Sequence, residues 1–296
     1  MKKMTEAQRA TLFSILVAIV TLALKFIAYF LTGSISLFSD AIETLINIAT
    51  AFVALIVMTI VAQPADEKHP YGHDKAEYFS SGMEGTLILV AAVSIIYASV
   101  HRFMHPSPLS QLSAGLIISV IAATLNLITS RFLLKVSHKY DSITLEAHAK
   151  HLLTDVWTTV GVIIGLVVIL FAPPSWQILD PIMAILVAIN ILYTGIYLVI
   201  RSFDGLMDSS LSRHEIHILR EAIQGELTDG THFKDLKTRK SGARRFVEFK
   251  LFVSGRTTVA KSHTLCDAIE AAIEKNLKNT IVTIHVEPIS EFSRND

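Results

Sequence analysis

The segments SDAIETLIN, residues 39–47, and HLLTD, residues 151–155, place ionisable side chains in stretches otherwise apolar enough to cross a bilayer. A hydrocarbon core of about 30 Å needs about 20 apolar residues in an α-helix. Charged groups inside that core are costly and usually serve a function. These segments therefore predict an α-helical membrane protein with a polar site among its helices.

Composition supports this class and argues against others. Of the 296 residues, 51% are hydrophobic and 18% are charged, which would leave a soluble protein with more apolar surface than its core could bury. The formal net charge is zero and no basic run contains interleaved aromatic residues, so we expect no nucleic-acid partner. The single cysteine, Cys266, excludes a paired-cysteine metal site and leaves histidines and carboxylates for metal chemistry.

Six apolar stretches predict six transmembrane helices in contact with the lipid bilayer. They lie near residues 10–32, 36–62, 79–102, 112–134, 144–172 and 178–200. Lys and Arg are concentrated in the connections on one side, and the positive-inside rule places that side and both termini in the cytoplasm. We expect residues 1–206 to form a multi-pass domain of the inner or plasma membrane.

The remaining residues, 207–296, have the composition of a soluble cytoplasmic domain. Apolar residues at helical spacing predict helices near 212–226 and 263–277. Alternating or β-rich runs predict strands near 233–240, 246–253 and 281–286. The predicted order of elements is αββαβ.

Polar residues of the second predicted helix recur at positions i, i+3, i+4 and i+7, which places Asp40, Glu43, Thr44 and Asn47 on one stripe. Counting about 1.5 Å per residue, Glu43 and Asn47 lie roughly 15–21 Å below the outer surface. In the fifth helix His151 and Asp155 are one turn apart, and Asp155 lies at a comparable distance from the inner end.

Two carboxylates, an amide and an imidazole from facing helices form a ligand set suited to a divalent transition metal. The alternative is an interhelical hydrogen-bond network that only holds the helices together. For Asp40 alone, a capping or orienting role and a ligand role both remain open.

The loop after the second helix contains a short-range cluster of Asp66, His69 and His73, and Gly72 permits a tight turn there. Taken alone, such a loop is more often solvated than bound to metal.

In the C-terminal domain His263 is predicted to open a helix, while His285 and Glu287 alternate on a strand and share one face. A helix end beside a strand end provides a further metal site, and surface histidines are the alternative.

These motifs resemble the cation diffusion facilitator family, and the bacterial zinc and iron exporters in particular, over nearly the whole chain. The resemblance is carried by SLFSDA at 36–41, HPYGHDKAE at 69–77, HLLTD at 151–155 and IHVEP at 284–288. It implies a homodimer of six-helix protomers, a metal site between helices two and five, and a cytoplasmic ferredoxin-like domain that dimerises and binds metal.

The resemblance also assigns the membrane residues. His151 and Asp155 match the ligands of the fifth helix, while Glu43 and Asn47 stand where the family usually has His or Asp followed by Asp. Asparagine removes a negative charge at that position, so the metal preference of zinc-selective relatives cannot simply be transferred.

Outside the membrane, Asp66, His69 and His73 match the family's loop site. His263, His285 and Glu287 fall on ligand positions of the C-terminal domain. Lys234 and Lys250 replace the histidines of a dinuclear site, so we expect at most one metal there. Lys75 and Asp208 fall on the positions of an interprotomer charge lock.

We therefore expect proton-coupled efflux of divalent transition-metal cations from the cytoplasm by alternating access. Zinc is the first candidate, followed by manganese, iron and cobalt. The metal is both substrate and regulator, protons are the counter-ion, and no enzymatic activity is expected because no nucleophile is recognisable. The alternative is a membrane-anchored metal sensor without transport, against which the buried polar stripe argues.

Overall fold

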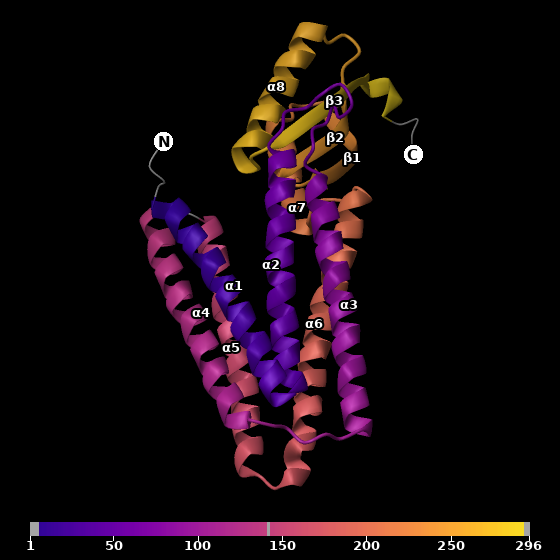
Figure 1. The fold of residues 1–296 in the computed structure, drawn as a ribbon. Coiled ribbons are helices and arrows are strands. Elements are labelled where there is room, and N and C mark those ends of the chain that lie inside the picture. The colour runs from indigo at the N-terminus through magenta and orange to yellow at the C-terminus, as the bar shows by residue number, and fades with distance from the viewer. Residues whose placement is uncertain (1–5, 141–142, 293–296) are drawn as a thin grey trace. The chain divides into compact units, whose positions relative to one another are not determined.

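The computed structural model describes residues 6–140 and 143–292 and contains the predicted six long helices followed by an αββαβ domain (Figure 1). The helices are α1 (Glu6–Thr32), α2 (Ile35–Val61), α3 (Ala76–Met104), α4 (Leu112–Tyr140), α5 (Ile143–Phe171) and α6 (Leu179–Leu206). Each contains a segment long and apolar enough to span a membrane. A short 3-10 helix, Pro174–Ile178, precedes α6. The predicted fold class is confirmed.

The described chain divides into two compact units. One contains the residues up to Leu55 together with Met83–Val199, and the other contains Ile56–Gly82 together with the residues from Ile200 onward. The first holds most of the membrane helices, and the second holds the α2–α3 loop and the αββαβ domain. The division predicted at residues 206 and 207 stays a prediction.

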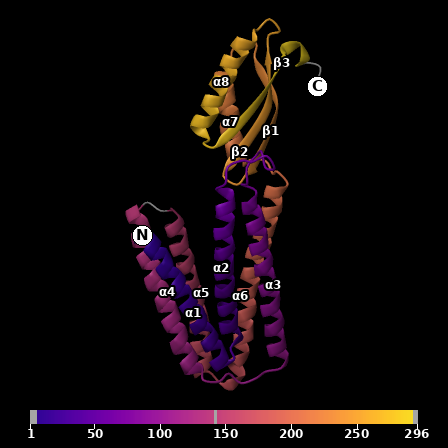
Figure 2. The same ribbon diagram turned by 45° about the horizontal axis from the view of Figure 1, so that its top comes forward.

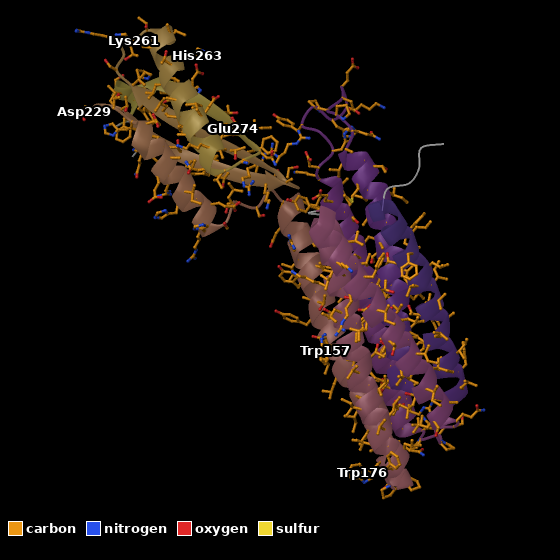
Figure 3. All side chains as sticks on the ribbon, turned by 90° about the vertical axis from the view of Figure 1, so that its left-hand side faces the viewer. Trp157, Trp176, Asp229, Lys261, His263 and Glu274 are labelled. Atoms are coloured by element: carbon orange, nitrogen blue, oxygen red, sulfur yellow. The ribbon has the colours of Figure 1, made fainter. Side chains whose placement is uncertain are left out.

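Two apolar clusters organise the membrane helices. In one, Ala28 of α1 and Leu37 of α2 pack with residues of α4 and α5, and in the other Ile35 of α2 packs with α3 and α6. Since α2 contributes to both clusters, it joins the two groups of helices. Large apolar side chains of these helices face outward. Trp157 of α5 and Trp176 of the short 3-10 helix are 69% and 49% exposed (Figure 3).

A buried carboxylate joins the start of α2 to the start of α6. Asp180 is 1% exposed and accepts hydrogen bonds from the Ser34 hydroxyl (2.6 Å) and the backbone amides of Ile35 (2.8 Å) and Ser36 (3.1 Å). Free amides at a helix N-terminus need acceptors, and a carboxylate there also complements the helix dipole. Asp180 thus fixes α2, which carries Glu43 and Asn47, against α6.

The αββαβ domain is a three-stranded sheet covered on one face by two helices (Figure 2). Its elements are α7 (Arg213–Glu226), β1 (His232–Ser241), β2 (Arg244–Val253), α8 (Val259–Asn276) and β3 (Thr280–Pro288), followed by a 3-10 turn, Ile289–Glu291. β2 pairs antiparallel with β1 and parallel with β3. Alternate β2 residues from Val247 to Val253 face the core, where they pack against Leu219 and Ile223 of α7 and Ile269 and Ile273 of α8.

The ends of α7 and α8 follow from capping. Ser212 and Glu215 form a capping box at the start of α7. The Thr258 hydroxyl accepts a hydrogen bond from the Lys261 amide, so α8 begins at Val259 rather than at His263. The sequence prediction placed this helix start four residues too late because a capping threonine was overlooked.

Candidate metal site

A cavity of about 320 Å³ lies among the membrane helices, and all four predicted transport ligands line it. Glu43 and Asn47 reach it from α2, and His151 and Asp155 reach it from α5. Asp155 is 5% exposed, whereas His151 is an exposed residue. Two of the four residues of the predicted helical stripe, Glu43 and Asn47, therefore share one cavity with the predicted pair of α5.

The ligand atoms surround this cavity without closing on one point. Among the described residues, its carboxylates and imidazole do not form a group of three with all ligand atoms within 4.8 Å. The Asn47 side chain lies near Asp155, but its Nδ2 atom is buried without a hydrogen-bond partner in the described chain. The Asn47 amide oxygen and the carboxylates of Glu43 and Asp155 are oxygen ligands of a kind that a divalent cation binds.

Asp40 has a different partner. Its Oδ1 atom accepts from the Lys25 ammonium at 2.8 Å and from the Thr159 hydroxyl at 3.0 Å. Lys25 Nζ also lies 2.8 Å from Thr44 Oγ1. Asp40 is not among the residues that line the cavity. Of the two roles left open by the sequence, these contacts are those of an orienting residue, and ligation by Asp40 stays a prediction.

The loop cluster is the most compact metal-type arrangement in the described chain. Asp66, His69 and His73 each offer a ligand atom, and all three atoms lie within 4.8 Å of one another. His73 Nε2 is 3.1 Å from His69 Nδ1 and 3.5 Å from Asp66 Oδ2. The backbone amide of His69 donates to the Asp66 carboxylate and holds its pKa below the usual range. The cluster therefore keeps an ionised carboxylate beside two imidazoles.

A left-handed glycine shapes this loop. Gly72 has φ of +84° and its amide donates to the His69 carbonyl at 2.9 Å, which returns the chain toward His73. Any other residue is strained at this backbone angle.

The C-terminal candidates are brought together only in part. His263 and Glu287 line a pocket of about 480 Å³ with Cys266, and His263 lies near Lys261 at one end of α8 (Figure 3). His285 is not in that lining, but its Nε2 atom is 3.2 Å from Glu287 Oε1. The predicted shared face of β3 is therefore present.

Two lysines surround this region as the sequence suggested. Lys250 Nζ lies 3.4 Å from Glu287 Oε1 and 3.3 Å from Asp235 Oδ2. Lys234 Nζ lies 4.2 Å from the ring centre of Phe292. An ammonium beside Glu287 competes with a cation for that carboxylate, which is consistent with the expectation of at most one metal.

Lys75 and Asp208 form an ion pair of 2.9 Å within one chain. Arg239 Nη1 lies 3.4 Å from the same carboxylate. The resemblance implied a contact between protomers for these positions, whereas here the pair joins the α2–α3 loop to the segment after α6 in a single protomer.

The sequence interpretation missed two residues. Lys25 is the only charged residue between Leu12 and Thr32, which was a usable signal of a buried partner. Glu84 of α3 also lines the cavity, and it is the only acidic or basic residue between Glu77 and His101. Both were overlooked because their helices were treated only as apolar spans.

A six-helix membrane domain with a carboxylate, imidazole and amide cavity defines a membrane transporter for cations. Residues 11–207 match the model of the cation efflux transmembrane domain, and residues 211–289 match that of the cation efflux protein, cytoplasmic domain. The first match covers more than half of the chain. The chain belongs to the cation efflux, or cation diffusion facilitator, family, whose members export divalent cations.

Curated relatives match over most of their length. An uncharacterized transporter of Synechocystis sp. is 40% identical over 278 residues, covering 94% of this chain and 89% of the relative. The cation-efflux pump FieF of Citrobacter koseri is 27% identical over 289 residues, covering 97% and 94%. A solved structure of the metal-bound C-terminal domain of the CzcD transporter from Thermotoga maritima is 28% identical, covers 27% of this chain and 95% of that chain, and has a TM-score of 0.24.

Proposed function

We propose that this chain exports zinc from the cytoplasm in exchange for protons, through a site formed by Glu43, Asn47, His151 and Asp155. The observation that carries the proposal is the single cavity into which α2 and α5 present these side chains. Zinc is the first candidate because imidazole and carboxylate oxygens are its usual ligands in open sites. Manganese, iron and cobalt are its competitors.

Proton exchange follows from the same residues. Metal binds only deprotonated imidazole and carboxylate, so metal entering from the cytoplasm displaces protons and protons from the other side displace the metal. An unperturbed imidazole titrates at about pH 6.5, so a proton and a metal ion compete for it near neutral pH. In alternating access, the cavity then opens in turn to the two sides of an inner or plasma membrane, with both termini cytoplasmic.

In this proposal the C-terminal site and the loop site regulate transport. The family resemblance implies a homodimer, and a single metal held by His263, His285 and Glu287 stabilises it when cytoplasmic metal rises. The loop cluster of Asp66, His69 and His73 binds a further metal. Such sites change transport through coupling to the dimer without lying on the transport path.

Reconstituted vesicles with an internal metal-sensitive dye and an imposed pH gradient test the transport claim. We expect zinc flux that requires the proton gradient and is lost in Asp155→Ala. The matched control is Asp204→Ala, which removes an exposed carboxylate of α6 outside the cavity lining. Undiminished flux in Asp155→Ala contradicts the site, and metal binding without flux in the wild type indicates a sensor instead.

A further inference from the structure

Besides Glu43, His151 and Asp155, a fourth ionisable residue lines the cavity. This residue, Glu84, lies outside the family motifs. Glu84 lines the cavity from α3 together with Ile88, Ala91 and Ile95, at positions i, i+4, i+7 and i+11 of one helical face. This face is apolar except for the carboxylate. Among the side chains that the structure describes, those of residues 12–54, 56–136 and 149–292, Glu84 forms no hydrogen bond or ion pair. A carboxylate on an apolar wall inside a membrane is costly, so it needs a partner that arrives from outside.

Glu84 lies at the same level of the membrane helices as His151. Glu84 is eight residues from the start of α3 at Ala76, and His151 is eight residues from the start of α5 at Ile143. Both helices begin at the end of the bundle where α2 leads into its loop, so each residue is about 12 Å from that end. Both side chains line the same cavity.

The other ligands lie deeper along the same cavity. Asp155 is one turn beyond His151, and Glu43 is eighteen residues from the loop end of α2 at Val61. At about 1.5 Å per residue, Glu43 is roughly 27 Å from that end along its helix. The cavity therefore presents Glu84 and His151 first, and Asp155, Asn47 and Glu43 after them, to an ion that comes from the loop end.

We propose that Glu84 and His151 form an access site, which takes a divalent transition-metal cation from the cytoplasmic side before the ion passes to Asp155, Asn47 and Glu43. This inference rests on the proposed function. Glu84 supplies an anionic oxygen beside the exposed imidazole, and His151 belongs to both sites, so the ion keeps one ligand during transfer. The additional carboxylate also offsets the charge that Asn47 lacks.

The test is zinc transport in the same vesicles, measured across zinc concentrations for Glu84→Gln. This variant keeps size and removes charge. Because capture is weakened while the deeper site is intact, we expect the KM for zinc to rise at least tenfold and the maximal rate to change less than twofold. Glu84→Asp is expected to restore most of the affinity.

Ser94→Ala is the matched control, since it removes an exposed polar group of α3 outside the cavity lining without changing charge. It is expected to leave the KM unchanged. An unchanged KM in Glu84→Gln overturns the access site while Asp155→Ala still tests the transport site. A loss of maximal rate with a lower thermal midpoint, unrelieved in Glu84→Asp, assigns Glu84 a structural role and also overturns it.

Discussion

The Lys25 ammonium lies 2.8 Å from the Asp40 carboxylate, and the two side chains are only 2% and 4% exposed. Thr44 of α2 and Thr159 of α5 add hydrogen bonds to this pair. The network therefore connects α1, α2 and α5. It lies one turn from Glu43 on α2 and one turn from Asp155 on α5, so it fixes the helices that carry the cavity ligands.

Removing one partner leaves an uncompensated charge. We expect Lys25→Met and Asp40→Asn each to lower the free energy of unfolding by about 3–5 kcal/mol. The double variant is expected to lose much less than the sum, because neither charge is then unpaired. Denaturant or thermal unfolding of the purified protein in detergent measures all three.

Additive losses in that double-mutant cycle contradict a direct Lys25–Asp40 interaction. Thr194→Val, on α6 and outside the network, serves as the reference for an ordinary membrane substitution.

The sequence predicted the helices well and the packing of their faces less well. Long apolar stretches identify spans by composition, and alternation identifies β2, because both signals are local. The partners of Lys25 and the place of Glu84 in the cavity wall depend on which helices lie side by side, and no local pattern contains that information. The sequence did indicate Glu43 with Asn47, and His151 with Asp155, as candidates. The two residues of each pair are one helical turn apart in the same helix, which is a local pattern.

The loop cluster is predicted to bind one divalent metal per protomer. His69→Ala removes the central imidazole, whose Nδ1 lies 3.1 Å from both Asp66 Oδ1 and His73 Nε2. Titration of Co²⁺ into the purified protein, followed by visible absorption, is expected to show one fewer bound ion per chain. His217→Ala, an exposed histidine of α7, is the control and should leave the stoichiometry unchanged. An equal number of bound Co²⁺ ions per chain in wild type and His69→Ala would contradict a metal site in this loop.

The Lys75–Asp208 pair predicts a specific pH dependence of stability. The Lys75 hydrogen bond holds the pKa of Asp208 below its ordinary value of 3.8. A lowered folded-state pKa adds stability that is fully present above the unfolded pKa and is lost as pH falls through the folded one. We therefore expect wild type to exceed Asp208→Asn in thermal midpoint at about pH 5–7, and the difference to shrink as the pH falls below the ordinary value of 3.8.

Both side chains of that pair are more than one third exposed, so the difference should be small and should shrink at high salt. Asp229→Asn, in an exposed turn, is the control for a general charge effect. A difference that grows on acidification would falsify the assigned direction of the pKa shift.

Asn47 is predicted to set the strength of metal capture. Asn47→Asp adds a negative charge to the cavity wall that Glu43 and Asp155 also line. We expect the KM for zinc to fall about tenfold, equivalent to about 1.4 kcal/mol. Competition transport across zinc, manganese, iron and cobalt should show altered ratios, because a carboxylate and an amide oxygen differ in charge and in proton binding.

Asn190→Asp separates ligation by residue 47 from a general field effect. Asn190 lines the same cavity from α6, so its replacement adds an equal charge to the wall but not to the α2 stripe. If position 47 ligates the ion, Asn47→Asp changes both KM and the metal ratios, whereas Asn190→Asp changes KM less and leaves the ratios alone. Equal effects of the two variants show that only the net charge of the cavity matters and contradict ligation by Asn47.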